Sequence, residues 1–174
     1  MISLEVSNNR RTTTTQTTET TKQKRKMVEK INLNIPITVV GTTFTGDYAK
    51  SPQFVTEVQE ILAKTNTTFV PNKALGVYYD NPEKNKPENL RCFQGVFLQN
   101  ETDNFDASLT KLTLKGNYLY TKKTGDPAKI VYEGYSEIFG YAHQHRVALK
   151  SHSGFQVSTF ENNQLTIEFY MEIL

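Results

Sequence analysis

The stretch TGDYAK at residues 45–50 returns as TGDPAK at residues 124–129, and this pair decides the interpretation of the fold. Each hexapeptide follows a stretch rich in β-branched and aromatic residues, which is typical of a strand. Each also precedes a run in which apolar residues recur at helical spacing. Glycine and aspartate suit the turn between two such elements. We therefore interpret each hexapeptide as a junction where a strand ends and a helix begins.

Residues 31–100 predict one strand–helix–strand–strand unit. Residues 35–44 (IPITVVGTTF) predict the first strand. We expect Ser51 to cap the helix and Pro52 to take its first position, followed by an apolar face made by Phe54, Val55, Val58, Ile61 and Leu62. The segments KALGVYYDNP (73–82) and LRCFQGVFL (90–98) predict two strands joined by a polar turn.

Residues 107–174 repeat this order. LTKLTLKGNYLYTKK (109–123) predicts a strand that bends at Gly116. We expect Asp126 to cap the second helix and Pro127 to begin it, with an apolar face running to about His145. SGFQVSTFENN (153–163) and LTIEFYMEIL (165–174) predict the last two strands. The pattern thus predicts an α+β fold made of a duplicated unit, with antiparallel strands and two helices packed on one face.

Residues 1–30 differ in composition from the rest. They contain TTTTQTTETT followed by KQKRK (22–26) and few apolar side chains, so we expect a disordered tail. The basic run is interpreted as a solvated linker, with a nuclear-import signal or an anionic-surface patch as the alternative.

The overall composition excludes several classes of function. A formal net charge of +2 is too small to indicate a nucleic-acid partner, and the single cysteine, Cys92, excludes an internal disulfide framework. No stretch approaches the roughly 18 apolar residues of a membrane span. We expect a cytoplasmic protein, with a nuclear or ER-associated location through partners as alternatives.

The stretch from residue 73 to residue 98 carries a family resemblance. Its pieces are VYYDNP (77–82), a proline in the following turn (Pro87) and LRC (90–92) before the next strand. Over residues 32–174 the chain resembles GyrI-like small-molecule-binding domains, which also serve as effector-binding domains of bacterial transcription activators. Within that superfamily it looks closest to the eukaryotic testis-expressed ER-phagy receptor family. The resemblance implies a pseudo-twofold axis and a ligand cleft between the two repeats (about 31–100 and 107–174).

The same resemblance implies what such a cleft binds. The bacterial relatives bind bulky apolar, often cationic compounds between aromatic walls, usually with one buried carboxylate in a Glu-x-Tyr motif after the second helix. In this sequence the stretch matched to that motif is 157–160, where Ser158 replaces the glutamate and Phe160 the tyrosine. Serine carries no charge, so cation binding, and the hydrolysis that some relatives perform with this glutamate, are not expected to carry over.

Aromatic residues supply the remaining candidates for the ligand site. Strand alternation places Tyr118 and Tyr120 on one face, and helical spacing does the same for Tyr135 and Phe139. The predicted ligand-binding set is Tyr79, Tyr118, Tyr120, Tyr135, Phe139, Ser158 and Phe160. Ordinary core packing is the alternative for each of them.

The predicted function is a non-catalytic module that binds a hydrophobic or lipid-like small molecule. No glycine loop or ligand spacing indicates a cofactor or a metal, and no catalytic residue is assigned. One alternative is a protein-interaction module related to the ER-phagy receptors, whose membrane anchor and acidic tail do not lie within these 174 residues. A further alternative is a hydrolase of reactive small molecules.

Overall fold

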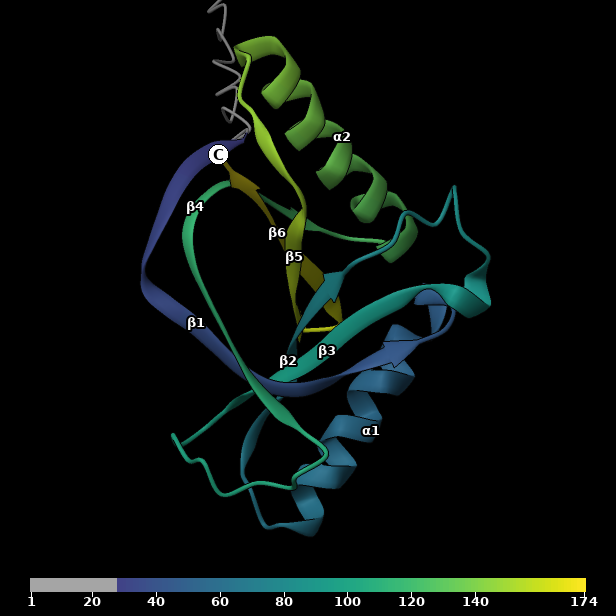
Figure 1. The fold of residues 1–174 in the computed structure, drawn as a ribbon, viewed down its shortest axis with the longest axis vertical. Coiled ribbons are helices and arrows are strands. Elements are labelled where there is room, and N and C mark those ends of the chain that lie inside the picture. The colour runs from purple at the N-terminus through teal and green to yellow at the C-terminus, as the bar shows by residue number, and fades with distance from the viewer. Residues whose placement is uncertain (1–27) are drawn as a thin grey trace, which may run out of the picture.

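The computed structural model describes residues 28–174, apart from the side chains of residues 152 and 153, and its strands form a closed antiparallel barrel (Figure 1). The order around the barrel is β1-β3-β2-β5-β6-β4. The strands are β1 (Glu29–Thr45), β2 (Phe69–Tyr78), β3 (Arg91–Leu98), β4 (Thr110–Thr124), β5 (Leu149–Glu161) and β6 (Gln164–Ile173). The helices α1 (Ser51–Lys64) and α2 (Pro127–His145) lie outside the barrel, and η1 (Tyr48–Lys50) and η2 (Pro87–Asn89) are short 3₁₀ turns.

The predicted α+β class is confirmed, and β1 begins earlier than expected. Val28 packs in the core and Glu29 pairs with Tyr120, so the expected domain boundary at residue 31 falls inside a strand. The Thr-rich stretch and the KQKRK run lie outside the described residues. No helix of the described part combines the length and the apolar character that a membrane span requires.

Closure of the sheet depends on the two longest strands, β1 and β4, which pair with each other. β1 also pairs with β3 toward its C-terminal end, where Val40 faces Val96. The β1–β4 ladder shifts register between Leu33 and Ile37, and Gly116, opposite Leu33, has a φ of +127°. A positive φ suits glycine, and together with the register shift it bends the ladder. The predicted bend at Gly116 is therefore present, and it lets the two strands close a barrel that the sequence pattern does not predict.

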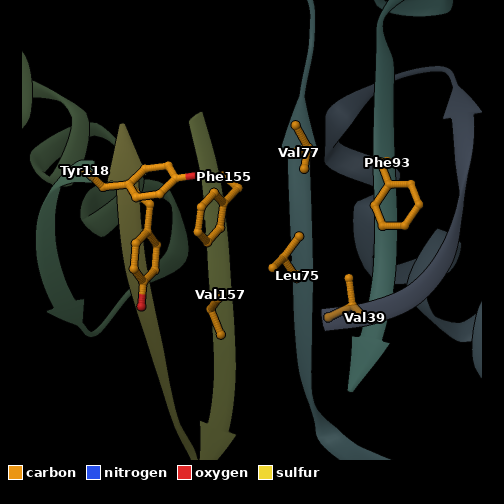
Figure 2. Close-up of a cluster of buried hydrophobic side chains, with 8 residues drawn as sticks. Val39, Leu75, Val77, Phe93, Tyr118, Phe155 and Val157 are labelled. Carbon is orange, nitrogen blue, oxygen red and sulfur yellow. The ribbon is translucent and has the colours of Figure 1, made fainter. Parts of the chain in front are cut away.

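Strand alternation divides the apolar side chains between the inside and the outside of the barrel. Inside, Phe155 stacks on Tyr170 with ring centroids 4.3 Å apart and meets Tyr118 edge-on at 5.3 Å. Figure 2 shows Tyr118, Phe155 and Val157 on one side of this cluster, with the side chains of β1, β2 and β3 on the other. The interior is therefore occupied by packed side chains.

Outside, each helix buries its apolar face against a different part of the barrel. From α1, Val58 and Leu62 pack with Val40 and Val96. From α2, Ile130, Ile138 and Ala142 pack with Leu119 and Phe169. The two helices thus cover separate patches of the barrel, and the surface over β2 and β5 lies between them.

Both hexapeptides form strand-to-helix junctions, as predicted. Asp126 caps α2 by accepting hydrogen bonds from the backbone N–H groups of Ala128 and Lys129. In the first junction Asp47 caps η1 instead, accepting from the N–H of Ala49. The prediction that Ser51 caps α1 is wrong. The 3₁₀ turn runs directly into the helix, and the Ser51 hydroxyl donates to the carbonyl of Tyr48 at 2.8 Å.

Candidate functional site: a groove between the helices

A groove of about 770 Å³ lies between α1 and α2, over the middle of β2 and β5. The walls are mostly apolar and the floor carries polar groups. Val55, Pro71, Val131, Leu165 and Ile167 contribute to the walls, while Tyr78, Gln94, Gln156 and Ser158 contribute polar atoms. This volume falls in the range of about 300–1,000 Å³ that small-molecule sites occupy.

Strand alternation selects which residues reach the groove. In β2 the side chains of Leu75 and Val77 point into the barrel, so Ala74 and Tyr78 face outward with Gly76 between them. In β5 the interior positions are Phe155 and Val157, which leaves Gln156, Ser158 and Phe160 on the groove side.

Gly76 lies at the centre of the floor. It pairs with Gln94 of β3 on one side and with Gln156 of β5 on the other. A Cβ atom at this position would lie 3.0 Å from the Tyr78 ring and 3.1 Å from Nε2 of Gln94. Glycine therefore lets the Tyr78 ring and the Gln94 amide come close over the strand.

The two glutamines are held differently. Gln94, 2% exposed, approaches Oγ of Ser51 with its Nε2 at 3.5 Å, and Tyr78 Oη approaches the same hydroxyl at 3.5 Å. Gln156, 8% exposed, donates from Nε2 to the phenol oxygen of Tyr135 at 2.8 Å. The Gln156 contact links the barrel to α2 beside the groove.

The hydroxyl and thiol groups near the floor are poor acids. Burial raises the pKa of Tyr135 to about 12, although its hydrogen bond with Gln156 acts in the opposite direction. Burial also raises the pKa of Tyr78 and of the Cys92 thiol. These groups are therefore neutral at physiological pH, and a thiol with a raised pKa is a weak nucleophile.

Charge is nearly absent from the groove. Among the described residues that line it, none is an aspartate or a glutamate, and Lys73 is the one charged side chain. Its Nζ lies 4.6 Å from the centroid of the Phe97 ring. The groove therefore lacks the carboxylate that would neutralise a bound cation.

The structure divides the seven predicted ligand residues among several places. Ser158 and Phe160 line the groove, and Ser158 Oγ approaches the carbonyl of Ala74 at 3.5 Å. Tyr135 supports Gln156 beside the groove. Phe139, 50% exposed, stacks on Tyr135 with ring centroids 6.0 Å apart. These four lie on the outside of the barrel.

The other three predicted residues lie on the inner side of the sheet. Tyr118 is buried in the interior cluster, and Tyr120 packs against it. Tyr79 also packs against that cluster and lines a separate pocket of about 520 Å³ with Thr43, Asp80 and Arg91. The sheet separates these tyrosines from Ser158 and Phe160, so the seven residues do not form a single site.

Sequence reasoning missed the glutamines and one carboxylate. Gln156 precedes Ser158 by two residues, so alternation along the strand was a signal that could have identified it. The chain also contains the Glu-x-Tyr spacing one strand later than expected, at Glu168 and Tyr170. Glu168 accepts a hydrogen bond from Tyr120 Oη at 2.8 Å on the inner side of the sheet, away from the groove.

Comparison with known proteins identifies the fold. No family model matches the chain, and no curated protein matches its sequence. The C-terminal domain of EcmrR is similar in structure, with a TM-score of 0.64 and 11% identity over 84% of this chain and 95% of that domain. An uncharacterized conserved protein from Listeria innocua has a TM-score of 0.64 and 9% identity over 86% of this chain and 93% of its own.

A third similar structure is that of SAV2435 bound to tetraphenylphosphonium, with a TM-score of 0.51 and 14% identity over 84% of this chain and 92% of that chain. In the EcmrR–DNA complex the present chain spans 56% of the EcmrR chain. These likenesses show that the chain shares the fold of these proteins. They give no support to the closer resemblance to ER-phagy receptors.

Proposed function

We propose that this protein is a non-catalytic module that binds a hydrophobic or amphipathic small molecule in the groove between α1 and α2. The observation that carries this proposal is the groove itself, with a volume of about 770 Å³, apolar walls and a polar floor. Pockets that combine apolar lining with a few placed polar groups are the usual form of small-molecule sites. Ser158 and Phe160 would contact the ligand, and Tyr135 would hold Gln156 in place.

The arrangement of the chain gives further support. The order β1-α1-β2-β3 is followed by β4-α2-β5-β6, and the barrel order places β2 beside β5. We infer that these are two copies of one unit related by a pseudo-twofold axis, with the groove between them. SAV2435, which shares the fold, is described in complex with tetraphenylphosphonium.

Two features disfavour the alternatives. A hydrolase at this site would need an acid, a base or an activated nucleophile, and the floor offers neutral amides, hydroxyls and tyrosines instead. An aromatic-x-x-aliphatic motif that binds autophagy proteins would need its aromatic side chain exposed. Residues 170–173 fit that pattern, but Tyr170 is 7% exposed and packs on Phe155.

A bulky side chain at the mouth of the groove tests the proposal. Thr56 is exposed on α1 and lines the groove, so Thr56→Trp should obstruct it without disturbing the core. Gln53→Trp adds the same side chain at an exposed α1 position that does not line the groove, and it serves as the matched control.

The measurement is calorimetric titration and thermal shift with a panel of neutral, cationic and anionic triphenyl compounds. We expect at least one of them to bind the wild-type protein and the Gln53→Trp variant but to bind Thr56→Trp at least tenfold more weakly. Absence of binding by the whole panel, or equal binding to both tryptophan variants, would refute the groove as the site.

A further inference from the structure

We infer that the groove selects uncharged ligands that carry a hydroxyl or amide group, and that Gln156 is the side chain that recognises this group. The inference rests on the proposed function, since it assumes that the groove binds a small molecule. It concerns the chemical class of that molecule.

The side chain of Gln156 has incomplete hydrogen bonding within the protein. A carboxamide offers two N–H donors and an oxygen acceptor, and the Gln156 side chain makes one hydrogen bond within the described part of the protein, to Tyr135. No buried side-chain nitrogen or oxygen atom of the described residues lacks a partner. Gln156 lines the groove, so its second polar atom, the carboxamide oxygen, is accessible from the groove rather than sealed in the core.

The amide of Gln156 is held in a fixed position. Gln156 is 8% exposed, and its contact with Tyr135 at 2.8 Å joins a strand residue to a helix residue. Gln94 differs because its Nε2 contacts Ser51 Oγ at 3.5 Å, a longer contact than the 2.8 Å bond of Gln156, so its amide is held less firmly. Of the two floor glutamines, Gln156 is thus the one held in place with hydrogen-bonding capacity directed to a ligand.

The charge of the groove lining disfavours a cationic ligand. A cation transferred from water into a largely apolar groove needs a carboxylate, and the described lining residues include none. The one charged side chain of the lining, Lys73, is itself a cation, and its ammonium lies over the Phe97 ring. A neutral hydroxyl or amide can both donate to and accept from Gln156, and it loses less hydration than an ion does.

Three polyphenyl probes separate the possibilities: triphenylmethanol, triphenylmethane and the tetraphenylphosphonium cation, which carries a fourth ring. For the wild-type protein we expect triphenylmethanol to bind about two- to tenfold more tightly than triphenylmethane, as one net hydrogen bond provides. We expect tetraphenylphosphonium to bind most weakly. The preference for triphenylmethanol should disappear in Gln156→Leu, while triphenylmethane binding is retained.

Gln156→Glu tests the charge argument with a side chain of nearly the same shape. We expect it to strengthen tetraphenylphosphonium binding at least tenfold over wild type. Gln144→Glu makes the same charge change at an exposed position of α2 and should leave all three affinities unchanged.

Tyr135→Phe provides a variant that keeps the ring and removes only the hydroxyl, in case substitution of Gln156 prevents folding. We expect it to reduce the preference for triphenylmethanol, because the amide loses its anchor. An unchanged probe preference in both Gln156→Leu and Tyr135→Phe would overturn the inference and leave the proposed function standing. Failure of every probe to bind, or equal binding to both tryptophan variants of α1, would overturn both.

Discussion

The Asp80 carboxylate and the Arg91 guanidinium form a two-pronged ion pair, with Nε to Oδ2 and Nη2 to Oδ1 distances of 3.0 Å. The backbone N–H of Arg91 donates to the same carboxylate at 2.8 Å. Tyr48 reinforces the link, because its hydroxyl accepts from the N–H of Asp80 and donates to the carbonyl of Arg91. These contacts fasten the two ends of the connection at residues 81–90, which is exposed except at Leu90.

Loss of the Asp80–Arg91 ion pair should loosen the connection at residues 81–90 more than it loosens the barrel. In Asp80→Asn the amide cannot accept both guanidinium bonds, so we expect faster hydrogen exchange at residues 81–90 with little change in β5 and β6. Mass spectrometry of exchanged peptides measures this directly. Glu88→Gln removes the same charge within the exposed turn η2 and serves as the control. Equal exchange in the two variants would contradict a clamping role.

Two glycines of α2 should respond in opposite directions to alanine. A Cβ at Gly134 would lie 2.4 Å from the Phe169 ring, and one at Gly140 would meet nothing within 4 Å. Helix propensity favours alanine at both by roughly 1 kcal/mol, but overpacking typically costs about 1–3 kcal/mol. We expect Gly134→Ala to lower the free energy of unfolding in urea and Gly140→Ala to raise it. A stabilised Gly134→Ala would show that α2 does not pack tightly on β6.

Tyr135 should make the protein sensitive to alkaline pH. Burial raises its pKa to about 12, above the value of about 10 for an exposed tyrosine. Below pH 10 the phenol is protonated in both states and its contribution to stability is complete. Between about pH 10 and pH 12 the unfolded chain ionises first, so about 2–3 kcal/mol of stability is lost.

Urea unfolding at pH 9, 10 and 11 measures this loss. We expect Tyr135→Phe to show a smaller fall in stability over this range than the wild-type protein. Tyr132→Phe changes an exposed tyrosine of the same helix, 76% accessible, and should follow the wild-type profile. A Tyr135→Phe profile that parallels the wild type would contradict the assignment.

Cys92 should be protected from thiol reagents in the folded protein. The side chain is fully buried, and burial raises the pKa of the thiol, so little thiolate is present or accessible. We expect its reaction with Ellman's reagent at pH 8 to be slow in buffer and rapid in urea. Native reactivity comparable to that of free cysteine would mean that the β2–β3 region opens readily.

Local chemistry made part of this architecture predictable from the sequence. Asp126 and Pro127 start α2 because a capping carboxylate and a fixed φ act within a few residues. The pairing of β1 with β4 involves segments far apart in the chain, and no local pattern encodes it. Ser51 satisfies the local rule for a cap, but the preceding 3₁₀ turn overrides that rule.

The site was less predictable than the fold. Aromatic residues were selected by type, yet alternation sends Tyr118 and Tyr120 inside the barrel while Ser158 faces the groove. Alternation places Gln156 on the strand face of Ser158, but an amide has no distinctive functional signature of its own until its surroundings are known. Gln156 is meaningful only once Gly76 and Tyr135 are seen beside it.

Barrel closure also bears on how the protein meets other chains. An open sheet ends in strands whose unpaired N–H and C=O groups can recruit a further strand and seed aggregation. In the described part of this chain β1 and β4 pair with each other and close the sheet, but residues 29–39 of β1 and 110–117 of β4 pair on one side alone. These two stretches are therefore where a strand from another chain can add to the sheet.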